Sequence, residues 1–236
     1  LSLRRQRQMC IRDRDIRYRD AFLQGVEYLL SGQYENGGWP QFWPGPRGYQ
    51  VHITFNDDAI VNTLNMIRDM MNHKAPYEDD LIDKTLCVRL GKAFNKGIEC
   101  ILATQIIKDG EPSVWCQQND RETLKPAPAR AYELPSYCSA ESAGIVRLLM
   151  ELPAPDARVK RAVHGAMKWF DRYKLTGLKC ERIVLANGER DTRLVEDPQA
   201  KPIWARYYDL KYCEPYVCDR CLLYTSDAAD EGLGVD

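Results

Sequence analysis

The sequence predicts a mainly α protein: an incomplete array of antiparallel helical hairpins with a smaller, irregular lobe that contains a β-hairpin. Three observations support this fold class. Five stretches carry apolar residues at helical spacing, and long polar loops separate several of them. Near the C-terminal end, the period changes to the alternation that is typical of strands. In such an array the long loops gather at one end, where side chains from distant segments meet.

The helices follow from their apolar spacing and their end signals. The first is expected over residues 15–30, because Ser31 and Gly32 end its apolar run. The second is expected to begin at Asn56 or Asp57, with acidic residues in its first turn. The other helices are expected at 79–103, 140–150 and 155–173, the last with a proline near its start.

The segments after and between the helices are less regular. Two short apolar runs flank "ANGERDT", which predicts a hairpin that turns near Asn187 and Gly188. The segment "IWARYYDL", residues 203–210, is interpreted as another extended piece. The loops at 33–54 and 113–142 are too long for simple connections, and loops of this length usually carry function.

Composition limits the possible partners. The chain has 236 residues, of which 44% are hydrophobic, enough for one good core. Its 33 basic and 34 acidic residues nearly cancel, so neither nucleic acid nor a membrane is expected as a partner. We find no histidine-based triad and no glycine-rich phosphate loop.

Both chain ends are expected to be foreign to the fold. "QMCIRDR" at 8–14 and "CLLYTSDAADE" at 221–231 resemble translated sequencing-adapter read-through at the ends of assembled contigs. We therefore expect non-native-looking tails at 1–14 and 221–236, around a domain at 15–220 that is incomplete at its C-terminus. No signal peptide is visible after "LSLRRQRQ", but with a foreign start this does not fix the compartment.

Acidic residues gather in "HITFNDDAI", at the expected start of the second helix. Asn56, Asp57 and Asp58 could cap that helix, because carboxylates complement the positive end of the helix dipole. The same three residues are also a partial oxygen shell for a hard cation such as calcium. Spacing alone does not decide between the two.

The loop at 113–142 carries a second group of polar residues. Asp120 lies near Trp115, Lys125 and Arg130, and such a loop can simply be a solvated set of salt bridges. The combination also suits an acidic sugar, whose ring stacks on an aromatic side chain and whose carboxylate needs fork-like donors. On the predicted hairpin, Arg193 would be presented rigidly, although such an arginine is often only exposed.

Five motifs in order resemble polysaccharide lyase family 10, the pectate lyases. They are "YLLSGQYENGGWPQFWP", "YQVHITFNDDAIVNTL", "VWCQQND" with "PARAYELPSYCSAES", "DTRLVEDP" and "KPIWARYYDLKYCEPYVCDR". The resemblance covers about residues 15–220. It implies an incomplete α/α toroid with a smaller lobe, and anti β-elimination of α-1,4-polygalacturonate in the cleft between them.

The resemblance also implies roles for single residues. Asp57 and Asp120 would hold calcium with Asp58 beside them, and Asp120 would act with Arg193, the proton acceptor. A guanidinium is a poor base at neutral pH, because its intrinsic pKa is about 12.5 or higher. Nearby calcium and an alkaline optimum ease this difficulty. Substrate binding would fall to Lys125, Arg130, Arg206 and Trp115.

Alternatives remain at this stage. Gln33 to Trp39 fit the Gln-x-x-x-Gly-x-Trp spacing of terpene-cyclase toroids, but the motif occurs once and no DxDD-like motif accompanies it. A toroid glycoside hydrolase would use Asp57 or Asp58 with Asp120 as acid and base. An inactive polyuronate-binding fragment is the third alternative. By resemblance, we expect a secreted or periplasmic monomer.

Overall fold

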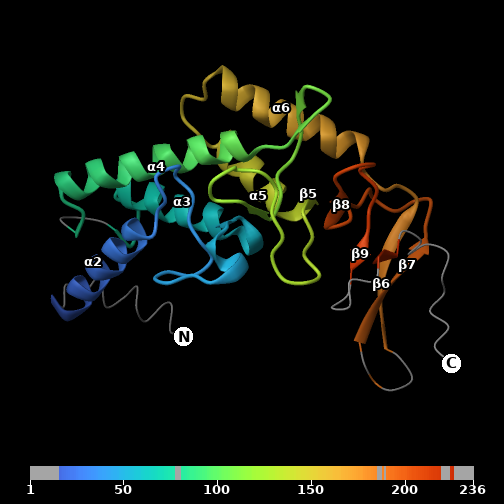
Figure 1. The fold of residues 1–236 in the computed structure, drawn as a ribbon, viewed down its shortest axis with the longest axis horizontal. Coiled ribbons are helices and arrows are strands. Elements are labelled where there is room, and N and C mark those ends of the chain that lie inside the picture. Colours follow the sequence, from blue (N-terminus) through green and yellow to red (C-terminus); the bar gives the residue numbers. More distant parts are fainter. Residues whose placement is uncertain (1–15, 78–80, 185–187, 189, 219–223, 226–236) are drawn as a thin grey trace.

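The computed structural model describes residues 16–77, 81–184, 188, 190–218, 224 and 225. The tail at 1–14 lies outside these residues, as does the tail at 221–236 except for Tyr224 and Thr225. The described part is mainly helical, as expected (Figure 1). Its α-helices are α2 (Ile16–Ser31), α3 (Ala59–Met71), α4 (Lys84–Thr104), α5 (Ser139–Met150) and α6 (Ala157–Arg172).

The helix starts show where local chemistry refines the predictions. Helix α4 starts later than expected because the Asp83 carboxylate accepts a hydrogen bond from the backbone N–H of Leu86 at 2.7 Å. Asp156 caps α6 in the same way, through the N–H of Val159 at 2.9 Å. The prediction for α3 is wrong at its start, because the acidic residues there precede the helix rather than form its first turn.

The helices form one packed group, and a small lobe lies at one end of it. Helix α3 packs against α4, and α5 packs against α6, with further contacts from α3 to α5 and from α4 to α6 (Figure 1). Their apolar faces meet in one core, to which the loop residues Trp39, Ile53 and Phe55 also belong. The antiparallel hairpin of β6 (Leu178–Val184) and β7 (Arg190–Glu196) projects beyond this group, as Figure 1 shows. The turn predicted at Asn187 and Gly188 falls largely outside the described residues.

Short antiparallel ladders fix the long loops. Strand β1 (Ile53–Thr54) pairs with β4 (Gln118–Asn119), which ties the loop at 33–54 to the loop at 113–142. Strand β5 (Ser136–Cys138) pairs with β8 (Tyr207–Asp209), within the segment predicted to be extended. In the remaining pairs, β2 (Ile107–Lys108) pairs with β3 (Glu111–Pro112), and β9 (Val217–Cys218) pairs with β10 (Tyr224–Thr225). The described residues also form two short 3-10 helices, η1 (Gly48–Val51) and η2 (Asn56–Asp58).

The motif from Gln33 to Trp39 closes the end of α2 against α4. The Gln33 amide donates to the carbonyl groups of Gly37 and Ala93, at 3.0 and 2.9 Å. The Trp39 indole N–H donates to the carbonyl of Leu29 at 2.9 Å, at the C-terminal end of α2. Gly37 has φ of +91°, and a Cβ there would overlap the carbonyl of Lys96, so only glycine fits. The segment from Gln33 to Trp39 therefore holds the C-terminal end of α2 in a fixed position against α4.

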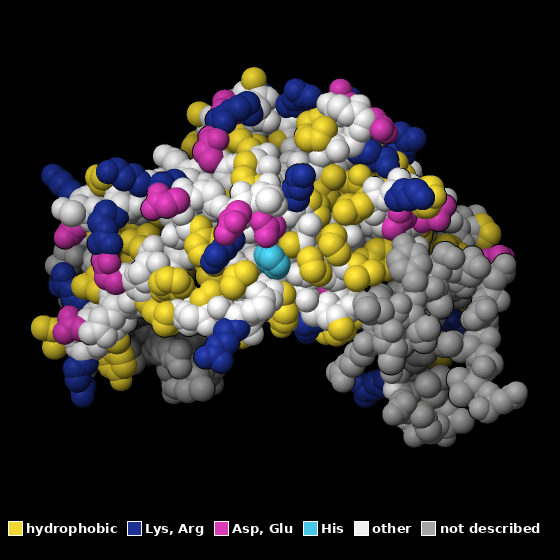
Figure 2. Space-filling view, in the orientation of Figure 1, with side chains coloured by type: hydrophobic (Ala, Val, Ile, Leu, Met, Phe, Trp, Pro, Cys, Tyr) yellow, Lys and Arg dark blue, Asp and Glu magenta, His cyan; other side chains and the backbone are white. Residues whose placement is uncertain are grey.

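Within the described residues, no helix combines the length and the apolar content needed to cross a bilayer. On the face drawn in Figure 2, Lys and Arg side chains are interspersed with Asp and Glu. A surface with both signs mixed in this way has no broad field of one sign on that face.

Candidate active site

Two consecutive aspartates before α3 adopt left-handed backbone conformations. Asp57 has φ of 52° and ψ of 36°, and Asp58 has φ of 58° and ψ of 24°. Such conformations are unfavourable for residues other than glycine, by about 1–3 kcal/mol each, and they concentrate at functional sites. Neither carboxylate caps the helix: Asp58 is the N-cap residue of α3, and its side chain makes no capping hydrogen bond. Helix capping therefore does not account for these two acids.

The two aspartates differ in their surroundings. The Asp57 carboxylate is 81% exposed, and its nearest cation is the Arg206 guanidinium at 3.6 Å. Asp58 packs against the backbone of Gly144 on α5, where a Cβ would overlap its Oδ1 atom. Burial, the charge of Glu141 and the charge of Asp57 raise the pKa of Asp58, although Arg147 opposes them. Both residues are exposed, but only Asp58 also packs against a helix.

The loop rests on the buried amide of Asn56, which is 4% exposed. Its Nδ2 donates to Glu133 Oε1 at 3.2 Å, and its Oδ1 accepts from the Arg206 guanidinium at 2.8 Å. Glu133 in turn accepts two hydrogen bonds from the Arg130 guanidinium, at 2.8 and 2.5 Å. Both functions of the amide are used, so the backbone before Asp57 has one defined position.

Two arginine–carboxylate pairs flank this amide. Burial raises the pKa of Glu133, but hydrogen bonds from Arg130 and from Asn56 outweigh burial and leave that pKa below its ordinary value. The second pair joins Arg206 to Glu141, which is 3% exposed, at 2.6 Å. Burial lowers the pKa of Arg206, and the hydrogen bond and charge of Glu141 raise it above its usual range.

Each arginine keeps one exposed side. The side chains of Arg130 and Arg206 are 45% and 41% exposed, while their partners Glu133 and Glu141 are buried. Arg130 lies over the Tyr132 ring and Arg206 over the Tyr207 ring, at 4.9 and 5.2 Å from the ring centroids. The guanidinium groups are therefore held rigidly and still reach solvent beside Asp57.

Asp120 follows β4 in a tight turn. Its Oδ1 accepts from the N–H groups of Glu122 and Thr123 and from the Thr123 hydroxyl, at 3.0, 2.7 and 3.0 Å. These hydrogen bonds lower the pKa of Asp120. Its Oδ2 lies 3.7 Å from His52 Nδ1, and the carboxylate is 35% exposed. Lys125 is exposed two residues beyond this turn, and its carbonyl accepts from the Asp120 backbone N–H at 2.8 Å.

Trp115 does not lie on the surface of the site. Trp115 was expected to stack on a sugar ring, and that expectation is wrong because its side chain is completely buried. Its indole N–H donates to the carbonyl of Ile101 at 2.7 Å, and its backbone N–H donates to the Ser142 hydroxyl at 2.9 Å. Trp115 is a core residue that fixes the loop behind the site.

Arg193 lies on a different element from the acids. It is exposed on β7, opposite Glu181 on β6, and Figure 1 shows this hairpin set apart from the start of α3. No ion pair among the described residues connects Arg193 to Asp57 or to Asp120. Its predicted catalytic role remains a prediction.

Oxygen donors in this region suit calcium only in part. Asp57 and Asp120 are hard carboxylate ligands with exposed oxygens, which calcium prefers. Within the described residues, however, no three Asp, Glu, His or Cys side chains converge on a point that could hold a metal ion. Any calcium at Asp57 would therefore need water and substrate oxygens to complete its shell, with Asp58 as a further neighbour.

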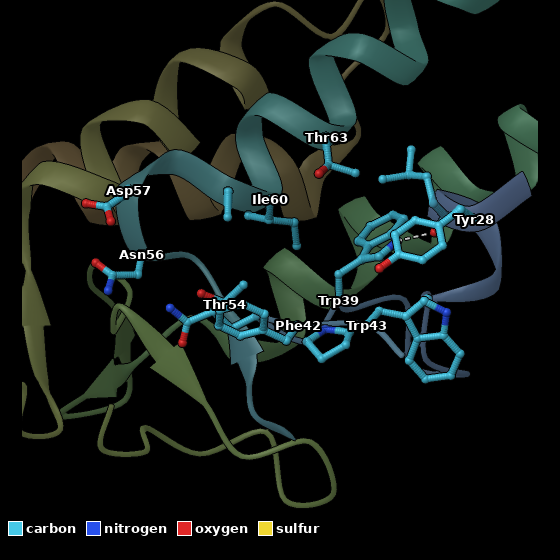
Figure 3. A pocket seen from close by; sticks show the side chains of 14 residues that line it. Tyr28, Trp39, Phe42, Trp43, Thr54, Asn56, Asp57, Ile60 and Thr63 are labelled. Atoms are coloured by element: carbon cyan, nitrogen blue, oxygen red, sulfur yellow. Dashed lines mark hydrogen bonds between the residues drawn. The ribbon is translucent and has the colours of Figure 1, made fainter. Parts of the chain in front are cut away.

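A groove that the sequence did not predict runs from Asp57 along the loop at 33–54. We call it the aromatic groove; its volume is about 450 Å³. Figure 3 shows Asn56 and Asp57 at one end, Tyr28 and Trp43 at the other, and Phe42 with Thr54 between them. The clustering of Trp and Pro residues in this loop was the available signal. Which rings stay exposed depends on tertiary packing, and spacing does not report it.

Comparison with known proteins gives consistent results. The profile of a family described as "Pec_lyase: Pectic acid lyase" matches residues 7–230. A solved family 10 polysaccharide lyase from Cellvibrio cellulosa, in a mutant form in complex with trigalaturonic acid, superposes with a TM-score of 0.82 and 31% identity over 91% of this chain and 66% of its own. A second structure of a family 10 polysaccharide lyase from Cellvibrio cellulosa has the same TM-score, the same identity and the same share of this chain, and 65% of its own chain is covered. This chain thus spans just under two thirds of their length. No curated protein sequence matches the chain.

Proposed function

The chain belongs to the pectic acid lyase family, and we propose that it cleaves α-1,4-polygalacturonate by anti β-elimination. One observation carries the proposal: the left-handed Asp57–Asp58 loop, which is anchored on two arginine–carboxylate pairs whose carboxylates are buried and whose guanidinium groups are partly exposed. Backbone strain that a network of this kind maintains is typical of functional sites. The trigalaturonic acid in the similar structure supports the same class of polymer as substrate.

The proposed reaction takes place within one uronate unit and its neighbour. A base removes the proton from C5, the electron pair of that C–H bond forms the C4=C5 double bond, and the C4–O4 bond breaks. The leaving oxygen takes up a proton and becomes the new hydroxyl of the neighbouring unit. No water is added, so the product carries an unsaturated uronate at one end.

The chain's residues divide this work by position. We assign C5 proton removal to Arg193, and binding of substrate carboxylates to the exposed sides of Arg130 and Arg206. Lys125, which is exposed near the Asp120 turn, would bind a further carboxylate. Calcium, when bound at Asp57 and Asp120, would supply a Lewis acid that makes the C5 proton more acidic.

The ionisation of Asp120 is consistent with its proposed role as a calcium ligand. The hydrogen bonds from Thr123 and Glu122 lower the pKa of Asp120 and favour its ionised form, which suits a cation ligand. The family relationship further supports a protein that acts on pectate outside the cell or in the periplasm.

The reaction class is tested by its product. The purified chain is mixed with polygalacturonate at alkaline pH, once with calcium and once with a chelator, and near-ultraviolet absorbance is followed. The proposal expects absorbance from the unsaturated product with calcium and little with chelator. New reducing ends without absorbance would indicate hydrolysis. Polymer binding without any cleavage would support the alternative of an inactive polyuronate-binding fragment.

A further inference from the structure

The aromatic groove has the shape and position of a binding subsite. Its volume of about 450 Å³ lies within the range of small-ligand sites, and it opens at Asn56 and Asp57. The loop that forms it is fixed to β1, because Thr54 N donates to the Trp39 carbonyl at 3.0 Å and Gln41 N to the Gln50 carbonyl at 3.1 Å. A polymer bound at Asp57 can therefore continue into the groove.

The walls of the groove offer exposed ring faces. Phe42 is 55% exposed and Tyr28 is 53% exposed, although both are large apolar residues. Trp43 packs on the backbone at Gly32, and its indole N–H donates to the Ser31 hydroxyl at 3.1 Å. An exposed aromatic residue is common on protein surfaces, but three rings around one groove form a surface on which a sugar ring can stack.

The floor of the groove offers a free polar group. Thr54 is 4% exposed and lines the groove, and its Oγ1 has no hydrogen-bond partner among the described residues. A buried hydroxyl without a partner is unfavourable, so the position favours a ligand that supplies one. Figure 3 places Thr54 between Asn56 and Phe42, along the path from the acids to the rings.

The charge of the groove determines which sugar unit it suits. Of the described residues that line it, Asp57 alone is charged, and no Lys or Arg is among them. A free uronate carboxylate between Phe42 and Tyr28 would lose hydration without a cation among the lining residues, since Arg206 lies beyond them, 3.6 Å from Asp57. A methyl ester removes that charge and adds an apolar group for the rings.

We propose that the aromatic groove binds a methyl-esterified galacturonate unit next to the cleavage site. This inference rests on the proposed function and adds a specificity to it. The enzyme would then cut pectate whose free uronate lies over the acids and arginines while an esterified neighbour lies between Phe42 and Thr54.

Binding of defined trisaccharides tests the inference without relying on turnover. Trigalacturonate that is methyl-esterified at one terminal unit only and the fully free acid are titrated into the whole chain, and tryptophan fluorescence is followed. The ester is expected to bind more tightly. Phe42→Ala should weaken ester binding by about fivefold and leave the free acid within about twofold. The matched control Tyr18→Ala removes an aromatic ring that is 42% exposed on α2 and does not line the groove, so it should change neither.

Adding a positive charge to the groove gives a second test of the inference. Thr63→Lys places a cation at the groove wall and should shift the preference toward the free acid. The inference would be overturned if Phe42→Ala weakened the binding of both ligands equally. It would also be overturned if the wild-type chain bound the free acid as tightly as the ester. A chain that forms no unsaturated product but keeps the ester preference would contradict the proposed function and support the groove assignment.

Discussion

Arg206 and Asn56 are 150 residues apart in the sequence, yet the Arg206 guanidinium donates a hydrogen bond to Asn56 Oδ1 at 2.8 Å. The same guanidinium pairs with Glu141 at 2.6 Å and lies 3.6 Å from Asp57. One side chain after α6 therefore positions the loop before α3 and neutralises a carboxylate on α5. The acid site is held by contacts between distant segments, not by the local sequence around it.

Removal of the Arg206 charge should destabilise the protein. In Arg206→Met, the Glu141 carboxylate, which is 3% exposed, would lose its cationic partner. We expect the free energy of unfolding to fall by about 3 kcal/mol, because an unpaired buried charge is strongly unfavourable. Urea unfolding measures this, with Arg182→Met on the exposed face of β6 as the matched control. Equal effects of the two substitutions would contradict the role of Arg206.

Glu133→Gln should show a pH-dependent effect on stability. Folding lowers the pKa of Glu133 below its ordinary value of 4.5, so its stabilising contribution is complete above that pH and disappears as the pH falls through the folded-state pKa. The stability difference between wild type and Glu133→Gln should therefore be largest at neutral pH and shrink in acid. Urea unfolding at a series of pH values measures it. A difference that stays constant with pH would show that Glu133 acts through packing alone.

The close contact between Gly37 and α4 can be tested by comparing Gly37 with another glycine of similar conformation. Gly37→Ala would place a Cβ against the Lys96 carbonyl, whereas nothing lies within 4 Å of the corresponding position at Gly45, where φ is +74°. Gly45→Ala should lower stability by about 1 kcal/mol, from backbone strain alone. Gly37→Ala should lower it by about 3 kcal/mol more. Equal melting temperatures for the two variants would contradict the close approach of the loop to α4.

Arg193→Ala should abolish turnover with little loss of stability. The side chain is exposed on β7, so its removal leaves no cavity. The product-absorbance assay and thermal unfolding are measured together, and Arg190→Ala on the same strand is the control. A melting temperature that collapses in Arg193→Ala would identify a structural residue. Full activity in that variant would remove Arg193 from the mechanism.

Most of the fold, but only part of the candidate site, could be predicted from the sequence. Helical periodicity and end signals placed every described helix, because an amphipathic pattern reports directly which face is buried. The sequence placed Asp120 in a polar loop, but it assigned Asp57 and Asp58 to the first turn of a helix. It could not show that both are left-handed, since the contacts that hold the preceding Asn56 come from distant segments.

Tertiary packing decided the remaining features. Trp115 is predicted to bind a sugar because it lies among amides and charges, yet its side chain is completely buried and its indole N–H donates to the Ile101 carbonyl. Phe42 lies in the loop at 33–54 and is exposed, which the spacing of the sequence did not indicate. Burial of a single aromatic residue depends on what packs over it, and local spacing holds no information about that.

We propose that the left-handed acid at Asp57 serves catalysis and not stability. Asp57→Gly keeps the backbone conformation that glycine prefers and removes only the carboxylate, so stability should stay within about 1 kcal/mol of wild type. Asp109→Gly is the matched control, because Asp109 also has φ of 52° but lies in the turn between β2 and β3. Both variants are unfolded in urea and then assayed for unsaturated product on polygalacturonate with calcium.

We expect Asp57→Gly to remain folded and to lose turnover by at least about 100-fold, while Asp109→Gly keeps both stability and rate. A folded Asp57→Gly variant that forms unsaturated product at the wild-type rate would contradict it.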